Sequence, residues 1–173
     1  MSIAVIVPSM GRRSLGDTVA SVIPQLTVED QLIVEIDWPL SGEFGNYARD
    51  IAALKARTTH LWFLDDDDVA EPGALVAMRA AIQEDPTCAW FFRVKCGGGV
   101  VWKEERLRSD GQSGQCYLVP KKTGPEWNAK SCPSWTSKPN QHDFQWAEQL
   151  QATFGFKWNK AIVADLGVGV RPK

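Results

Sequence analysis

Four consecutive aspartates follow a short apolar stretch near the middle of this sequence. Residues 60–64 read HLWFL, and Asp65, Asp66, Asp67 and Asp68 come directly after them. Two like charges about 4 Å apart repel each other by roughly 4 kcal/mol at an effective dielectric constant of about 20. The cluster therefore needs full solvation on a flexible loop, a raised pKa on one carboxyl group, or a bound cation. Carboxylate oxygens are the ligands that Mg²⁺ and Mn²⁺ prefer, so the cluster is a candidate metal site.

The segments around the aspartates predict an α/β fold with a mostly parallel central sheet flanked by helices. Strand-like apolar runs alternate with segments whose apolar residues recur at helical spacing. Short connections between such segments indicate right-handed crossovers and parallel strands. The expected strands are 3–8, 32–37, 60–64, 88–94, 99–103, 116–120 and 161–167, and the expected helices are 15–26, 44–57, 72–82 and 142–154.

Two acidic features follow the carboxyl ends of predicted strands. Asp37 ends the strand 32–37, and the four aspartates follow the strand 60–64. In an open parallel sheet, ligands bind at the edge where the carboxyl ends of the strands meet. This placement favours a ligand site over an acidic loop that only meets solvent, although the solvated loop remains an alternative.

Length and composition are those of a globular protein. The chain has 173 residues, of which 44% are hydrophobic and 23% charged, so we expect one domain over residues 1–173. No run approaches the roughly 18–20 apolar residues of a membrane span. The basic residues near the N-terminus follow its apolar run rather than precede it, which is the wrong order for a secretory signal. We therefore expect a cytoplasmic protein without a membrane span.

The charge is distributed unevenly along the chain. Residues 1–92 carry 6 Lys and Arg against 14 Asp and Glu, whereas residues 93–138 carry 9 against 4. Tryptophans 102, 127 and 135 lie within that basic region. A basic surface with aromatic side chains suits sugar stacking, and it also suits phosphate backbones and unstacked bases. Alternatively, the lysines only solubilise a region rich in tryptophan.

Four sequence pieces together resemble the family 2 glycosyltransferases. They are VIVPSMGRR at 5–13, VEIDWP at 34–39, GNYARD at 45–50 and LWFLDDDDVAEP at 61–72, and they occur in the order and at the spacing of that family. The resemblance covers about residues 3–85 and is weaker beyond them. It implies a single-domain GT-A fold, a Rossmann-like fold that binds nucleotide-diphosphate sugars. Residues 1–92 would then bind the nucleotide sugar, and residues 93–173 would bind the acceptor.

The same resemblance implies a set of site residues. The donor would be a nucleotide-diphosphate sugar, with a UDP-sugar expected, held together with Mn²⁺ or Mg²⁺. Three of these residues have alternative interpretations. Asp37 could form a turn, Arg12 could be a solvated surface residue, and Asn46 could cap a helix. Asp68 would be structural. The implied metal ligands are Asp67 and Asp65, and the implied donor-binding residues are Pro8, Ser9, Arg12, Asp37, Asn46, Arg49, Asp65 and Asp66.

One carboxylate must accept the proton of the acceptor hydroxyl during a direct displacement. Asp143 stands where the family places this base, but His142 replaces the glutamate that usually precedes it. His142 could tune the base or act in its place, and Asp143 could instead cap a helix. A double displacement needs a second, nucleophilic carboxylate, for which the sequence has no clear candidate. We therefore expect an inverting, metal-dependent glycosyltransferase.

The acceptor is left open between two classes. One is a saccharide or glycoconjugate. The other is a hydroxylated base in DNA, which would have to be flipped into the pocket, as expected of a small, soluble, phage-type DNA-modifying member. Two other functions compete: a nucleotidyltransferase, for which PSMGRRS at 8–14 is a poor phosphate loop, and a non-catalytic GT-A-like binding protein.

Overall fold

The structure is a computed structural model that describes residues 1–37, 45–102, 104–107, 113–121 and 142–167. Its first half alternates strands with helices, as the apolar spacing predicted. The elements in chain order are β1 (Ile3–Ser9), α1 (Leu15–Val22), the 3₁₀ turn η1 (Ile23–Gln25), β2 (Gln31–Ile36), α2 (Asn46–Lys55), β3 (His60–Phe63), β4 (Val69–Ala70) and α3 (Ala74–Glu84).

The second half contributes the remaining strands and one helix. The long strand β8 begins five residues before the predicted strand at 161–167. The elements are β5 (Ala89–Cys96), β6 (Gly99–Val101), the 3₁₀ turn η2 (Gly114–Cys116), β7 (Tyr117–Pro120), α4 (His142–Phe154) and β8 (Phe156–Leu166).

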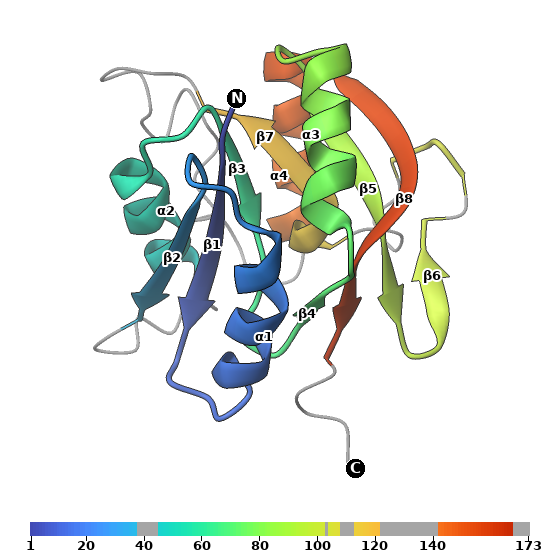
Figure 1. Cartoon of the computed structure of the whole chain (residues 1–173). Coiled ribbons are helices and arrows are strands. Elements are labelled where there is room, and N and C mark those ends of the chain that lie inside the picture. Colours follow the sequence, from blue (N-terminus) through green and yellow to red (C-terminus); the bar gives the residue numbers. More distant parts are fainter. Residues whose placement is uncertain (38–44, 103, 108–112, 122–141, 168–173) are drawn as a thin grey trace.

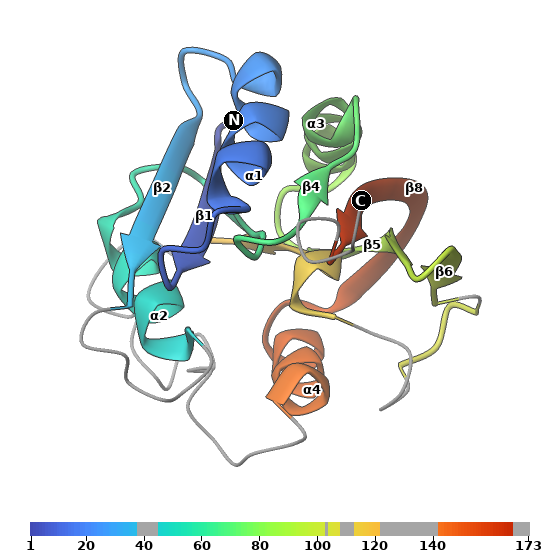
Figure 2. The ribbon, with the colours of Figure 1, turned by 90° about the horizontal axis from the view of Figure 1, so that it is seen from below.

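The strands of the described residues form one curled sheet in the order β2-β1-β3-β7-β5-β8-β4, with β6 paired to β5. Figures 1 and 2 show α1 and α3 on one face of this sheet and α2 and α4 on the other. The α/β fold class is thus confirmed, and strands from both halves of the chain share the sheet.

The sheet is mixed, although most of its paired residues lie between parallel strands, as expected. β1 is parallel to β2 and β3, and β5 is parallel to β8. β7, however, is antiparallel to both β3 and β5, β6 is antiparallel to β5, and β4 is antiparallel to β8. Only two residues connect β5 to β6. Such a short connection permits an antiparallel pair, whereas a parallel pair would need a long crossover.

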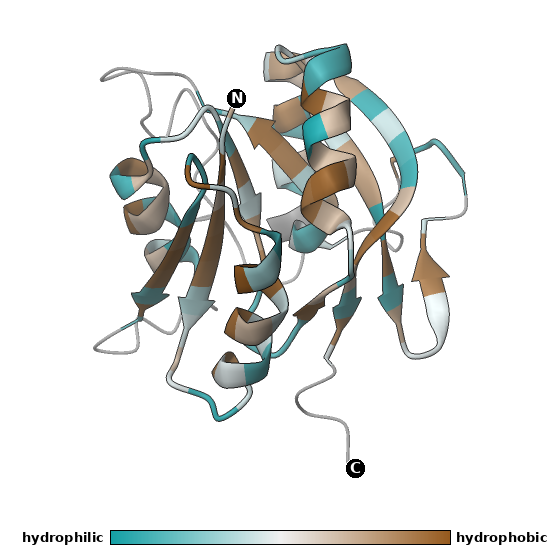
Figure 3. Ribbon diagram, in the orientation of Figure 1, coloured by the Kyte–Doolittle hydropathy of each residue, from teal (hydrophilic) through white to brown (hydrophobic). Residues whose placement is uncertain are grey.

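The core lies between the sheet and its two helical layers. Every residue of β1 and β3 is buried, which agrees with their continuous apolar runs. Figure 3 shows β1 as mostly hydrophobic, with hydrophilic residues toward the ends of several strands. In the described part of the chain, no helix combines the length and apolar character that crossing a membrane requires.

The carboxyl ends of β1, β2 and β3 meet at one edge of the sheet, because the three strands are parallel. Asp37 follows β2, and the four aspartates follow β3 after Leu64. The predicted convergence of these acidic residues at one edge is therefore confirmed.

Candidate functional site

A cavity of about 550 Å³ opens at this edge of the sheet. The end of β1 and the turn after it form one wall, the start of α2 forms a second, and the aspartate loop forms a third. The lining residues are Pro8, Ser9, Met10, Arg12, Asp37, Gly45, Arg49, Asp65, Asp66 and Asp67. Seven of the eight residues predicted for donor binding lie in this lining, together with the predicted metal ligand Asp67.

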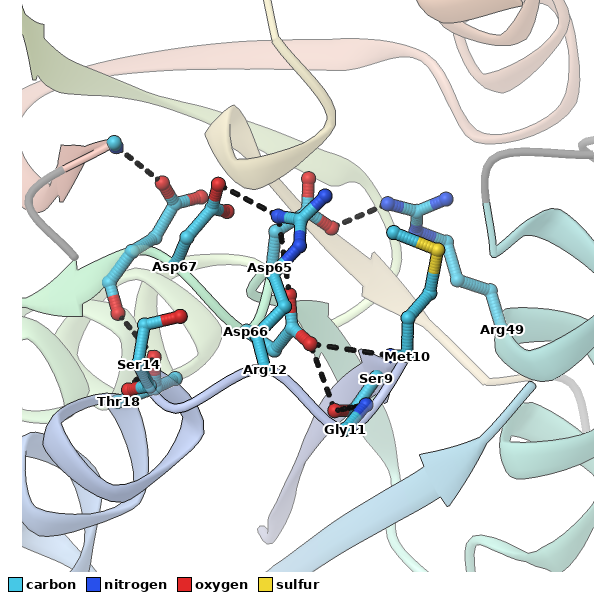
Figure 4. A network of polar contacts seen from close by, with 12 residues as sticks. Ser9, Met10, Gly11, Arg12, Ser14, Thr18, Arg49, Asp65, Asp66 and Asp67 are labelled. Carbon is cyan, nitrogen blue, oxygen red and sulfur yellow. Dashed lines mark hydrogen bonds and ion pairs between the residues drawn. The ribbon is translucent and has the colours of Figure 1, made fainter. Parts of the chain in front are cut away.

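Asp66 is held by the turn that follows β1. The Ser9 hydroxyl donates a hydrogen bond of 2.7 Å to Asp66 Oδ2, and the Met10 backbone N–H donates a second of 3.1 Å. The Gly11 N–H donates to Ser9 Oγ at 2.9 Å and so orients the hydroxyl. Figure 4 shows these contacts side by side. Asp66 is only 4% exposed, so the hydrogen bonds compensate for the burial of its charge.

Two arginines from different elements pair with the other carboxylates of the cavity. Arg12 Nη1 lies 2.7 Å from Asp67 Oδ2 and 3.3 Å from Asp66 Oδ1, as the dashed lines in Figure 4 indicate. Arg49, at the start of α2, forms an ion pair with Asp65. It also donates a 3.0 Å hydrogen bond to Asn46 Oδ1. The two guanidinium groups offset part of the repulsion within the cluster.

Asp68 lies deeper and connects the loop to the end of β8. Its Oδ1 accepts a hydrogen bond of 2.7 Å from the Gly167 N–H, and its backbone carbonyl accepts one of 2.7 Å from the Thr18 hydroxyl. Burial, reinforced by the charge of Asp65, raises the pKa of Asp68 to about 7. The Asp68 contacts agree with the structural role predicted for it.

The pKa of Asp67 is also raised. Burial is the main cause; Arg12 acts in the opposite direction, and the charges of Asp65 and Asp66 add to the increase. The alternative of a fully solvated acidic loop does not fit this environment, because Asp66 and Asp68 are buried. The cluster instead combines arginine partners, hydrogen bonds and raised pKa values.

Three of the four aspartates could also ligate one metal ion. One carboxylate oxygen each from Asp65, Asp67 and Asp68 lie within 4.8 Å of one another. A set of hard oxygen donors fits Mg²⁺ or Mn²⁺, which bind through one or two carboxylates and the phosphates of a substrate. The predicted ligands Asp65 and Asp67 belong to this set. Asp68 was not among the predicted ligands, and only its position after them could have suggested it.

The remaining donor-binding candidates differ in their positions. Asp37 is 4% exposed, and its N–H donates to the Ser9 carbonyl at 2.9 Å, so it joins the ends of β1 and β2. Asn46 does not line the cavity, but its side-chain oxygen accepts a hydrogen bond from Arg49, which does. It does not cap α2 either, because Gly45 is the N-cap residue.

Gly45 and Met10 line the cavity but were not predicted. Gly45 has φ = +77°, a conformation that strongly favours glycine. A Cβ at this position would lie 3.3 Å from Pro8 Cβ and 3.7 Å from Arg49 Nη1. The predicted helix 44–57 included Gly45, whereas α2 begins after it, at Asn46. The glycine itself was the available signal, because a residue with positive φ is needed where the chain enters α2 so close to β1.

Gly45→Ala is expected to lower the free energy of unfolding by about 1–2 kcal/mol, because alanine is strained at positive φ. It is also expected to weaken binding of UDP, the nucleotide of the donor that the sequence resemblance implies, because the new methyl group presses on Pro8 at the cavity wall. Thermal unfolding and calorimetric titration with UDP measure the two effects.

The matched control is Gly73→Ala. Gly73 has φ = +84° before α3, no atom lies within 4 Å of the position that a Cβ would take, and it does not line the cavity. This variant should lose similar stability and keep the wild-type affinity for UDP. Equal UDP affinities for the two variants would contradict a role of Gly45 in shaping the cavity.

The predicted catalytic pair lies at the start of α4. His142 is its first residue and Asp143 its second, but their side chains lie outside the described residues. The predicted proximity of Asp143 to a bound donor therefore stays a prediction.

The basic region 93–138 is described only in part. Trp102 is 5% exposed, and its Nε1–H donates to the Phe92 carbonyl at 2.7 Å. It belongs to an aromatic core cluster and not to a sugar-stacking surface, which corrects that expectation; strand β6 carries it inward against β5. The residues Lys103, Arg108, Lys122, Trp127, Lys130, Trp135 and Lys138 lie outside the described residues.

Most of the basic side chains that are described in this region have partners within the fold. Lys95 forms an ion pair of 2.8 Å with Glu71, and Lys121 donates to the Ala56 carbonyl. The Arg93 guanidinium lies 4.8 Å from the centre of the Trp102 ring. Arg106, by contrast, is exposed. The described part thus offers little of the open basic surface that a phosphate backbone requires.

Comparison with known proteins adds a family and a set of similar folds. The model of the family described as Glycosyl transferase family 2 matches residues 43–150. The comparison with curated proteins found no match.

Three solved structures have similar folds at low sequence identity. S. aureus TarS superposes with a TM-score of 0.68 at 12% identity, over 95% of this chain and 36% of TarS. A197 from STIV gives 0.57 at 14% identity, over 95% of this chain and 84% of A197. A glycosyltransferase involved in the glycosylation of the major capsid of PBCV-1 gives 0.58 at 13% identity, over 92% of this chain and 83% of that one. This chain thus spans about a third of the length of TarS.

Proposed function

The chain belongs to glycosyl transferase family 2, and from this premise we propose that it transfers a sugar from a nucleotide-diphosphate sugar to an acceptor hydroxyl with the help of a divalent cation. The observation that carries the proposal is the cavity at the carboxyl edge of the sheet. Its lining joins the carboxylates Asp65 and Asp67 to the β1 end at Pro8 and Ser9 and to the guanidinium groups of two arginines. Oxygen ligands and cationic groups together suit a metal-bound diphosphate.

A UDP-sugar is the donor that we propose. TarS residues 1–349 have been solved with UDP-GlcNAc and with UDP, on folds that superpose on this chain with TM-scores of 0.64 and 0.62. In this chain, Pro8, Ser9 and Asp37 would hold the nucleoside at the ends of β1 and β2. Asp67, with Asp65, would hold Mg²⁺ or Mn²⁺, which when bound would stabilise the charge that develops on the leaving diphosphate.

Asp143 is the proposed base, which would accept the acceptor proton as the hydroxyl oxygen attacks the anomeric carbon of the donor. The bond from that carbon to the diphosphate oxygen breaks in the same step, so the configuration inverts. Asp143→Asn is expected to lower kcat by about 10²-fold and to leave the donor KM near its wild-type value, since general bases contribute about 10²–10⁴.

His142→Gln separates the two candidate bases. If Asp143 is the base, this variant keeps a pH optimum and rate within a few-fold of the wild type. A full rate for Asp143→Asn together with a loss in His142→Gln would assign the base to His142 instead.

The proposed function is tested with a panel of nucleotide sugars, each with and without Mn²⁺. We expect a rise in thermal unfolding temperature for UDP-sugars that needs the metal, and slow release of UDP upon incubation. Mass spectrometry of acceptors, including oligosaccharides and hydroxymethylated DNA, then identifies the product. No metal-dependent stabilisation by any nucleotide sugar, and no release of nucleoside diphosphate, would overturn the proposal.

Of the two acceptor classes, we propose a saccharide or glycoconjugate. This choice rests on the buried position of Trp102 and on the intramolecular partners of Lys95 and Lys121. Acceptor affinity should therefore depend weakly on salt, whereas affinity for DNA would fall steeply as salt rises. A steep salt dependence of acceptor binding would favour DNA.

A further inference from the structure

We infer that Arg12 is an internal counter-cation for the aspartate cluster. When a divalent cation binds, the Arg12 guanidinium leaves Asp67 and pairs with the donor diphosphate. This inference rests on the proposed function and concerns how that site loads. It makes metal binding and nucleotide binding mutually dependent through one side chain of the protein.

The geometry places Arg12 directly on a proposed metal ligand. Its Nη1 lies 2.7 Å from Asp67 Oδ2, within hydrogen-bond distance, and 3.3 Å from Asp66 Oδ1. A divalent cation cannot take the lone pairs of Asp67 Oδ2 that face this guanidinium unless the arginine moves. Arg12 also lines the cavity, so a displaced guanidinium stays beside the space proposed for the diphosphate.

Arg12 is better placed to move than Arg49, the other arginine of the site. The Arg12 side chain is 40% exposed, and within the described residues its guanidinium contacts are these two carboxylates. It follows Gly11, which has φ = +76° and no atom within 4 Å of its would-be Cβ, so space surrounds the turn. The Arg49 side chain, in contrast, is only 10% exposed and is hydrogen-bonded to Asn46.

Asp66 does not depend on Arg12 for its position, because Ser9 and Met10 donate hydrogen bonds to its other oxygen. When Arg12 leaves, Asp66 therefore stays in place. Asp67 loses its ion-pair partner and is repelled by the neighbouring carboxylates. A metal without nucleotide must break the ion pair with no new partner for Arg12. A nucleotide without metal draws Arg12 away and leaves Asp67 uncompensated. Only joint binding satisfies all charges, and such coupling is reciprocal.

The experiment measures Mn²⁺ binding by electron paramagnetic resonance, with and without UDP, in the wild type, Arg12→Gln, Arg12→Lys and Arg13→Gln. Without UDP, Arg12→Gln should bind Mn²⁺ about fivefold more tightly than the wild type, which is the upper range for a partly exposed ion pair. The further gain in Mn²⁺ affinity that UDP produces should be smaller in Arg12→Gln than in the wild type.

Two variants control for other causes. Arg13 is an exposed neighbour outside the cavity lining, so Arg13→Gln removes the same charge without removing the contact and should bind Mn²⁺ as the wild type does. Arg12→Lys keeps a competing cation and should also stay near the wild type. Thermal unfolding in metal-free buffer verifies that each variant is folded.

The outcomes separate the inference from the proposed function. Suppose that the wild type binds Mn²⁺ with UDP, but that without UDP Arg12→Gln binds Mn²⁺ no more tightly than the wild type. This result overturns the inference and leaves the proposed function standing. The inference is also overturned if Arg13→Gln or Arg12→Lys increases the Mn²⁺ affinity as much as Arg12→Gln does. If neither the wild type nor Arg12→Gln binds Mn²⁺ even with UDP, the metal site itself fails and the inference fails with it.

Discussion

Asp67→Asn is expected to lower the rate of UDP release from a UDP-sugar by about 10³-fold. Asparagine keeps the shape of the side chain but removes the negative charge that would hold the cation beside the diphosphate. A bound metal contributes several kcal/mol to transition-state charge stabilisation, and about 4 kcal/mol corresponds to this loss of rate. A coupled assay for UDP at saturating Mn²⁺ measures the effect on kcat and KM.

The same variant should keep or slightly increase the stability of the fold. Burial raises the pKa of Asp67, so its ionised form costs folding free energy at pH values above the ordinary carboxyl pKa of 3.8, although the loss of the Arg12 ion pair offsets part of the gain. Asp17→Asn removes an equal charge from the exposed first turn of α1 and serves as the control. A wild-type rate in Asp67→Asn would contradict its role as a metal ligand, and unfolding of the variant would mean that any lost rate reflects the fold.

Asp30→Asn is expected to lower the free energy of unfolding by about 3 kcal/mol. The side chain of Asp30 is fully buried, and one oxygen lies 2.5 Å from Arg79 Nη2 on α3. The carboxylate also accepts hydrogen bonds from the Ile3 N–H at 2.9 Å and from Thr27. Breaking a buried ion pair by removing one partner costs about 3–5 kcal/mol. The lower value is expected because the Arg79 side chain is 23% exposed.

Asp30 joins the start of β1 to α3, so its loss should loosen the sheet that carries the site. Burial would raise its pKa, but the hydrogen bond from Arg79 and those from Thr27 and Ile3 outweigh burial and hold the pKa below 3.8. The stabilisation is therefore present above pH 3.8 and is lost as the pH falls through the lower pKa of the folded state. Asp30→Asn should remove this acid-sensitive part of the unfolding curve.

Glu84→Gln supplies the matched control, because Glu84 forms an exposed ion pair of 3.2 Å with Lys157. Its loss should cost much less than the loss of Asp30, because exposed ion pairs contribute little to stability. In the double variant Asp30→Asn with Arg79→Met, the loss should be smaller than the sum of the two single losses. Urea unfolding measures all four variants, and equal effects of Asp30→Asn and Glu84→Gln would contradict the proposed contribution of the buried pair.

The position of the acidic residues of the site was predictable from local patterns, whereas the other donor-binding residues were implied only by the family resemblance. A continuous apolar run marks each of β1 and β3, and residues at the carboxyl ends of parallel strands must share an edge. Ser9 and the aspartates 65–67 meet for that reason. Arg49 comes from a helix whose apolar spacing is also evident, but only the family resemblance indicated that its side chain belongs to the site.

The remainder depends on contacts between residues far apart in the chain, for which the sequence has no local signal. Gly167 bonds to Asp68 across 99 residues, and Arg79 bonds to Asp30 across 49. Trp102 looks like a surface aromatic in the sequence but is buried once β6 folds back onto β5. The antiparallel orientation of β7 could not be predicted, because a short apolar strand has the same residue pattern in either direction.

Anomalous diffraction from a crystal grown with MnCl₂ and UDP tests the central proposal most directly. We predict a manganese peak within about 2.5 Å of an Asp67 oxygen, bridged to the diphosphate, with the Arg12 guanidinium moved from Asp67 to a phosphate. UDP bound in the cavity with no manganese at the carboxylates, or manganese elsewhere with Arg12 still on Asp67, would contradict a metal-dependent donor site.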